Sequence, residues 1–187
     1  MESLRNYLAG NNFSEPDIEK IADAFEEKHY LKGDYFVQEG KTSKQLGFVE
    51  KGFVQYFVLI DGEEKTTYSV GENNFVTSLV SFLQQVPSKE NIRAVMETII
   101  WVIDRNGLNQ LQEDLPAFKN FYITLLEWQI CCIDESRLDA IMLTARQRYE
   151  KMLRKEPTLI QQIPLQYLAS ILGVTPRHLS RIRNSIR

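Results

Sequence analysis

The stretch from Leu165 to Asn184 constrains the fold more than any other part of the sequence, because its turn residues fit one arrangement of two helices. Apolar residues recur on one helical face up to Leu172, and Gly173 then stands where a left-handed turn would end a helix. Thr175 can cap a second helix, and Pro176 suits its first turn because an N–H there would have no helical partner. The spacing predicts a helix-turn-helix. The residues placed to pack its two helices together are Leu165, Leu168, Ala169, Ile171, Leu179 and Ile182.

The second of these helices carries a basic and polar face. Arginine offers a fork of donors that suits guanine edges and phosphates, and asparagine can pair with adenine. We expect Arg177 and Arg181, four residues apart on one face, to contact DNA bases. The alternative is a basic, solvated helix that ends a globular domain. The residues expected to contact the DNA backbone are Thr175, His178, Ser180, Arg183 and Asn184.

The formal net charge of −3 conceals an uneven distribution of charge. Residues 146–187 hold nine Lys or Arg against two Glu, a net of +7, and the rest of the chain holds 13 basic against 23 acidic residues, a net of −10. A basic terminal region on an acidic body is typical of a DNA-binding module joined to a separate sensor. We therefore expect double-stranded DNA as a partner.

Signals for a membrane, a secretory route or a metal are missing from the sequence. No run of 18 apolar residues is present, and the N-terminus lacks the basic start and apolar core of a signal peptide. Cys131 and Cys132 are adjacent, and neighbours on a helix point about 100° apart, so a disulfide between them is implausible and metal ligation lacks partners. We expect a cytoplasmic protein with no metal and no cofactor.

The region from His29 to Asp104 changes to short β runs separated by turn residues. Asp61 and Gly62 between two such runs predict a two-residue hairpin. Short strands with regularly spaced turns indicate a jelly roll or barrel, interrupted by a short helix from Ser78 to Gln84. Met1 to Lys28 is expected to be helical, which makes the predicted fold class α+β.

A long helix is expected next, capped by Asp114 and with Pro116 near its start. Apolar residues along it recur at alternating spacings of three and four, a stripe that can pair with a second copy of itself. The alternative is that the stripe packs on the β domain of the same chain. Thr144 is expected to mark a break after this helix. The residues predicted at the dimer interface are Phe121, Leu125, Trp128, Cys132, Leu138 and Met142.

The order of these parts resembles that of the bacterial Crp–Fnr transcription regulators over nearly the whole chain. The run from Arg148 to Arg183 is similar to the divergent branch of that family common in Bacteroidetes. The segments that carry the resemblance are Val37-Gln38-Glu39-Gly40, Phe48-Val49-Glu50-Lys51-Gly52, the run from Val70 to Val76, Thr144-Ala145-Arg146, Tyr149 and Leu153.

The resemblance implies three units. These are a cyclic-nucleotide-binding-type jelly roll with N-terminal helices over residues 1–113, a dimerisation helix over residues 114–143, and a helix-turn-helix DNA-binding domain over residues 144–187. It also implies a homodimeric transcriptional regulator that reads a two-fold symmetric operator. RNA polymerase is a further partner that the family suggests.

The expected effector site departs from the cyclic-AMP-binding members of that family. In those members a Phe-(hydrophobic)-Gly-Glu sequence and a later Arg hold the ribose and the phosphate. This chain has Phe75-Val76-Thr77-Ser78 there, and Ser88-Lys89 near the Arg position, so we expect no cyclic AMP binding. A different, anionic effector is the remaining option; the alternative is that the two cations are solvated strand-edge charges. The candidate residues for it are Thr77, Ser78, Lys89 and Arg93.

Two rival functions remain to be weighed against a transcription regulator. A cupin-type metalloenzyme typically needs several His and a carboxylate from its barrel, and the β region offers His29 alone, so we expect no enzyme. The second rival is a sensor or adaptor that binds a small anionic ligand and does not read DNA. The predicted helix-turn-helix argues against it.

Overall fold

The chain begins with two short helices in the computed structural model, which describes residues 1–155 and 157–186. These are α1 (Glu2–Gly10) and α2 (Glu15–Asp23). Ser14 caps α2, because its hydroxyl accepts a hydrogen bond from the Asp17 amide at 3.4 Å. The apolar sides of both helices pack on one end of the β domain.

The predicted helix up to Lys28 is wrong at its end. Residues Glu26–Tyr30 form strand β1, which pairs antiparallel with β8 (Thr98–Asp104). This pairing supplies partners for the backbone N–H and C=O groups of the segment, and tertiary structure therefore overrides the helical pattern that precedes it.

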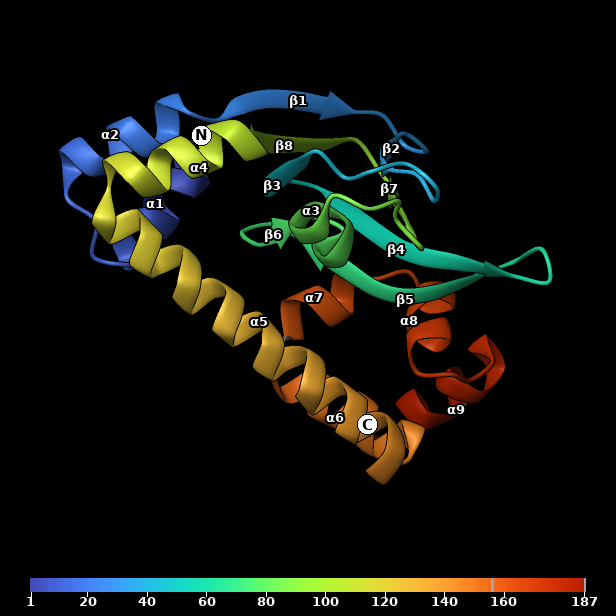
Figure 1. The fold of residues 1–187 in the computed structure, drawn as a ribbon. Helices are drawn as coiled ribbons and strands as arrows, with labels where there is room; N and C mark the ends of the chain where they lie inside the picture. The colour runs from blue at the N-terminus through green and yellow to red at the C-terminus, as the bar shows by residue number, and fades with distance from the viewer. Residues whose placement is uncertain (156, 187) are drawn as a thin grey trace.

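Six further strands complete a β-sandwich. They are β2 (Tyr35–Val37), β3 (Gln45–Lys51), β4 (Phe53–Ile60), β5 (Glu63–Gly71), β6 (Phe75–Val76) and β7 (Asn91–Ala94). The two sheets, β1-β8-β3-β6 and β2-β7-β4-β5, are antiparallel throughout and lie face to face (Figure 1). Val54, Ile92 and Ile100 are fully buried between them. The antiparallel β domain predicted from the sequence is confirmed.

The hairpin of β4 and β5 ends at Asp61 and Gly62, as predicted. Both residues have positive φ, 53° and 80°, which suits a two-residue turn between twisted strands. Asp tolerates this conformation better than most residues, and Gly adopts it without steric cost.

A β-bulge interrupts this hairpin near its middle. The register passes from Tyr56 opposite Tyr68 to Phe57 opposite Thr66, so that Thr67 has no partner on β4. This irregularity lies on the sheet that faces the C-terminal helices (Figure 1). It therefore frees backbone groups at the contact between the two parts of the molecule.

Two helices and a long third helix follow β6 and β8. They are α3 (Leu79–Gln84), α4 (Arg105–Asp114) and α5 (Pro116–Met142), and α5 runs obliquely away from the N-terminal helices (Figure 1). The predicted cap at Asp114 is wrong, because Asp114 ends α4 and Leu115 is the residue before α5. The Asp114 carboxylate accepts a hydrogen bond from Gln110 of α4 at 2.9 Å instead. None of the helices in the described ranges is long and apolar enough to cross a membrane.

The rest of the described chain is helical. It contains α6 (Ala145–Lys155), α7 (Pro157–Gln162), α8 (Leu165–Ile171) and α9 (Pro176–Ile186). The predicted break at Thr144 is confirmed, and its hydroxyl accepts from the Gln147 amide at 3.3 Å at the start of α6. Helix α7 was not predicted. We refer to α8, the following turn and α9 as the terminal helix pair.

A separate apolar core holds the C-terminal helices together. Its most buried members include Leu168, Ala169 and Leu179, which are fully inaccessible. Phe53 of β4, which is 2% exposed, belongs to this core although it comes from the sandwich. The terminal helix pair is therefore packed against the β domain of the same chain.

Candidate functional site

The turn inside the terminal helix pair has the geometry that the sequence predicts. Gly173 has φ of +67°, and the Val174 amide donates to the Ala169 carbonyl at 2.9 Å. The Thr175 hydroxyl accepts from the His178 amide at 3.2 Å, and this caps α9. The start of α9 is thus fixed by local hydrogen bonds at both sides of the turn.

Arg148 of α6 supports this turn from outside. Its Nη2 donates to the carbonyl of Leu172 at 2.6 Å, which is one of the carbonyls at the end of α8. Its Nε is buried and has no hydrogen-bond partner within the described residues. The sequence does not indicate this contact, because 24 residues separate the two partners.

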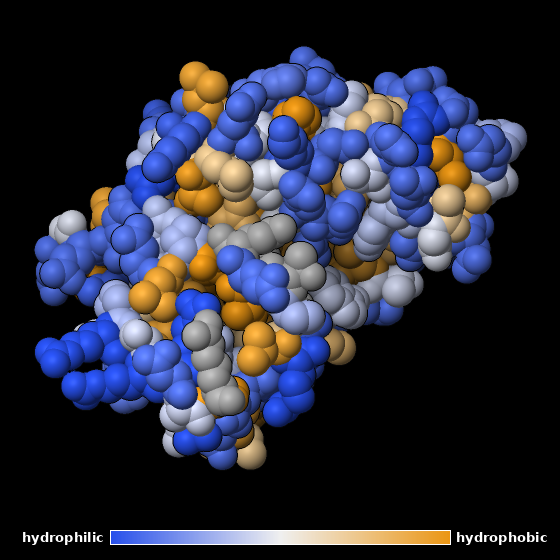
Figure 2. Space-filling model, turned by 180° about the vertical axis from the view of Figure 1, so that it is seen from behind, coloured by the Kyte–Doolittle hydropathy of each residue, from blue (hydrophilic) through white to orange (hydrophobic). Residues whose placement is uncertain are grey.

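The outer face of α9 is basic and open. Leu179 and Ile182 point into the core, whereas Arg177 and Arg181 are exposed. Neither arginine forms an ion pair with any residue in the ranges 1–155 and 157–186. Hydrophilic side chains cover this part of the surface, at the lower left of Figure 2. Of the predicted backbone contacts, Thr175, His178, Ser180 and Asn184 are exposed and Arg183 is half-buried.

Two lysines of α6, unlike the arginines on the outer face of α9, form ion pairs within the described residues. Lys151 pairs with Asp139 at 2.5 Å and with Glu135 at 2.8 Å, and Lys155 pairs with Glu135 at 2.7 Å. The two lysines lower the pKa of Glu135 to about 2 through these hydrogen bonds. Carboxylates of α5 therefore neutralise these two lysines of α6, whereas Arg177 and Arg181 of α9 have no ion-pair partner in the described structure.

The structure separates Arg93 from the other predicted effector residues. Thr77 and Ser78 lie at the start of α3, with Ser78 buried. Lys89 is exposed in the loop before β7. Arg93 of β7 binds Glu64 of β5 through two hydrogen bonds, at 2.9 and 2.6 Å. Arg93 is thus held away from the hydroxyl groups, whereas Lys89 lies in the chain between Ser88 and Glu90, the two residues that contact Ser78 Oγ.

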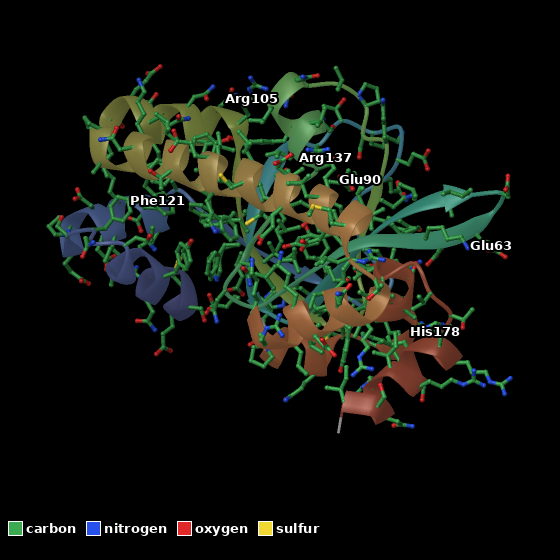
Figure 3. The ribbon with its side chains drawn as sticks, turned by 90° about the horizontal axis from the view of Figure 1, so that it is seen from below. Glu63, Glu90, Arg105, Phe121, Arg137 and His178 are labelled. Carbon is green, nitrogen blue, oxygen red and sulfur yellow. The ribbon has the colours of Figure 1, made fainter. Side chains whose placement is uncertain are left out.

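An acidic residue that the sequence reading missed lies beside these hydroxyls. Glu90 accepts a hydrogen bond from Ser78 Oγ at 3.1 Å, and Ser78 Oγ lies 3.0 Å from Ser88 Oγ. Burial raises the pKa of the Glu90 carboxyl, and the hydrogen bond from Ser78 opposes this effect. Figure 3 places Glu90 on the β domain, away from His178 on the terminal helix pair.

The raised pKa of Glu90 predicts a pH dependence of stability. The folded state favours the protonated Glu90 carboxyl. The contribution of this group to the free energy of unfolding is therefore present at low pH and is lost as pH rises through its folded-state pKa. We expect Glu90→Gln to shift the midpoint of urea unfolding upward relative to wild type as pH rises from acid to neutral, because the variant lacks the carboxyl whose ionisation opposes folding. Glu39→Gln, at an exposed carboxylate of a nearby loop, is the control and should leave the dependence unchanged. Equal pH dependence in wild type and Glu90→Gln would contradict the prediction.

The predicted dimer stripe is divided in the structure. Phe121 points toward the N-terminal helices, where its ring centroid lies 5.4 Å from that of Phe13 (Figure 3), and Leu125 packs against the same core. Trp128, Leu138 and Met142 are exposed; the most exposed of them, Met142, is 74% accessible. Cys132 is half-buried. The first part of the stripe is therefore covered by its own chain and the later part is open.

Helix α5 also exposes apolar side chains that the stripe omits. They are Ile123, Ile130, Ile133 and Ile141, and Ile130 is 63% accessible. The sequence signal for them was available, because Ile123, Ile130 and Ile133 repeat at the same spacings of seven and three that define a helical stripe. Exposed apolar groups therefore lie on more than one face of α5, between the charged residues of its second half.

The described part of the chain contains no cluster of potential metal ligands. No group of three or more His, Cys, Asp or Glu residues there could hold a metal ion. Cys131 and Cys132 form no disulfide.

Comparison with known proteins finds relatives of the β domain. Residues 27–114 match the family model described as Cyclic nucleotide-binding domain. Human cGMP-dependent protein kinase 2 is 29% identical over 136 residues, which cover 67% of this chain and 18% of the kinase. The chain thus spans less than a fifth of the length of this relative.

Two solved structures share the arrangement of the whole chain. A transcriptional regulator of the Crp/Fnr family from Eubacterium rectale has a TM-score of 0.67 at 18% identity, and the match covers 96% of this chain and 87% of that one. FixK2 from Bradyrhizobium japonicum has a TM-score of 0.73 at 15% identity, with coverage of 87% and 84%. Residues 27–114 of this chain are therefore similar to a cyclic nucleotide-binding domain, and its fold is similar to that of Crp/Fnr-family regulators.

Proposed function

We propose that this chain is a homodimeric, sequence-specific DNA-binding transcription regulator without catalytic activity. The terminal helix pair is its helix-turn-helix, and α9 enters the major groove. The observation that carries the proposal is the outer face of α9, where Arg177 and Arg181 are exposed and have no ion-pair partner in the described structure. Unpaired guanidinium groups on a rigidly capped helix are ready to contact bases and phosphates without first breaking an internal pair.

The second copy is proposed to pack along α5. The second half of α5 exposes several large apolar side chains in the single chain, beside the carboxylates that pair with α6. Exposed apolar groups that lie close together mark an interaction surface. A two-fold arrangement of α5 helices would place two α9 helices on one face of the dimer. Such a dimer reads half-sites about 34 Å apart, one turn of DNA.

The β domain is proposed to have lost the ability to bind cyclic nucleotides. Ser78 at the start of α3 already has a carboxylate partner, Glu90, so a phosphate at this place would meet a second acidic group. Arg93 does not reach this place, because Glu64 holds its guanidinium. We infer that the domain is either structural or a sensor of another small molecule.

Titration calorimetry tests the loss of nucleotide binding. With cAMP or cGMP at up to about 1 mM we expect no heat of binding, because no arginine reaches Ser78 and the Glu90 carboxylate would repel the phosphate. The control is a titration of the same protein preparation with its selected DNA duplex, which should give a binding heat. A micromolar affinity for either nucleotide would contradict this part of the proposal.

Selection from random duplex DNA tests the proposed function as a whole. We expect enrichment of a two-fold symmetric site with half-sites one helical turn apart. The affinity for that site should fall with salt concentration, with a slope of about −0.9 in log–log form for each phosphate contact. Failure to enrich any sequence, together with weak binding that is independent of salt, would contradict DNA reading and favour an adaptor.

A further inference from the structure

The contact between the β domain and the terminal helix pair is polar at its centre. Thr66 of β5 donates its backbone N–H to Ser170 Oγ of α8 at 2.8 Å. Thr66 is the residue next to the β-bulge, where the ladder to β4 changes register. Helix α8 thus attaches to the sheet at the point where the ladder is irregular.

A chain of side chains continues from this contact across the sheet. The Thr66 hydroxyl accepts from Gln55 Nε2 at 2.9 Å, and Gln55 Oε1 accepts from Arg93 Nη2 at 3.0 Å. Gln55 is fully buried and Thr66 is 4% exposed. Arg93 in turn holds Glu64 and lies over the Phe57 ring, 4.6 Å from its centroid. The chain crosses β7, β4 and β5 and ends on α8.

The direction of each hydrogen bond in this chain is fixed. Arginine can only donate, so the oxygen of the Gln55 amide must face Arg93 and its nitrogen must face Thr66. Gln55 therefore has one amide orientation that satisfies both of its partners, and the reverse orientation would leave a buried polar group without a partner. Such a contact stabilises one position of α8 on the sheet relative to positions that are slightly displaced from it.

We propose that Ser170, Thr66, Gln55 and Arg93 are positioning residues that dock α8 on the β domain and thereby set the orientation of α9. None of them lies on the outer face of α9, and none is expected to touch DNA. The inference rests on the proposed function, because the orientation matters where two copies of α9 must fit two half-sites at once. Docking keeps the two α9 helices of the dimer at one spacing. Once the first α9 is bound, the second therefore has a higher effective concentration at its own half-site.

The test compares Ser170→Ala with Ser185→Ala, the same substitution at a serine whose hydroxyl bonds only within α9, to the Ile182 carbonyl. Fluorescence anisotropy is measured on the selected two-half-site duplex, on a single half-site, and on duplexes with inserted or deleted base pairs between half-sites. For Ser170→Ala we expect a loss of about five- to tenfold on the full site, an unchanged half-site affinity and a broader tolerance of spacing. Arg93→Lys, which keeps the charge but loses the forked donors, should act in the same direction.

Hydrogen exchange without DNA separates this inference from the proposed function. In Ser170→Ala the Thr66 amide should exchange faster than in wild type or Ser185→Ala, whether or not the protein binds DNA. Unchanged exchange overturns the docking role. The link to spacing is overturned if Ser170→Ala loses equal affinity for the full site and the half-site, loses no affinity for either, or gains affinity for the full site. If the wild type selects no DNA while Thr66 exchange still rises, the proposed function fails and the docking role stands.

Discussion

Leu138→Asp is expected to convert the proposed dimer to a monomer. Leu138 lies in the exposed part of the predicted stripe on α5, 40% accessible in the single chain, and a dimer along α5 would bury it. An unpaired carboxylate buried in an apolar interface is strongly unfavourable, and the two-fold symmetry introduces it twice. We therefore expect dimer dissociation to become about a hundredfold or more easier. Sedimentation equilibrium over a range of protein concentrations measures this change.

The matched control is Leu31→Asp. Leu31 is an exposed leucine, 67% accessible, in the loop between β1 and β2, so the same substitution there should leave the oligomeric state unchanged. Ile130→Asp examines the other exposed face of α5. Dissociation by Ile130→Asp but not by Leu138→Asp would place the interface on the face that the predicted stripe omits. A wild-type protein that is monomeric at micromolar concentration would contradict the dimer itself.

The terminal helix pair could be predicted because its determinants are local. Gly173, Thr175 and Pro176 each act within a few residues, so their effect on the backbone is readable from the sequence. The Asp61-Gly62 hairpin was predictable for the same reason. The end of the first helical region was not, because β1 forms only where β8 is available to pair with it.

The parts of the candidate site that were missed depend on distant residues. The Thr66 amide and Ser170 are 104 residues apart in the sequence, and nothing near either residue indicates the other. Glu90 reads as an ordinary loop acid until the fold places Ser78 beside it. Periodicity found an apolar stripe on α5, but a stripe does not identify what covers it. For Phe121 the cover is the chain's own N-terminal helices.

Arg181→Ala is expected to weaken binding to the selected operator by about 1–3 kcal/mol and to relax the choice of base at one position in each half-site. The reason is that a guanidinium can donate two hydrogen bonds to one guanine edge, and alanine replaces none of them. Arg181 is exposed on α9 and has no ion-pair partner in the described ranges, so its removal breaks no ion pair there. Fluorescence anisotropy on the operator and on a set of single-base variants measures both effects.

Arg154→Ala controls for the loss of a positive charge from the same unit. Arg154 is exposed on α6 and has no ion-pair partner among the residues that the structure describes, but it does not lie on α9. We expect this control to change affinity slightly and equally for all base variants, since a charge away from the groove acts through long-range attraction. If Arg181 contacts a base, the affinity lost by Arg181→Ala should depend on the base at one position, whereas the affinity lost by Arg154→Ala should not. If both lose affinity uniformly, α9 acts through phosphate contacts and another element reads the sequence.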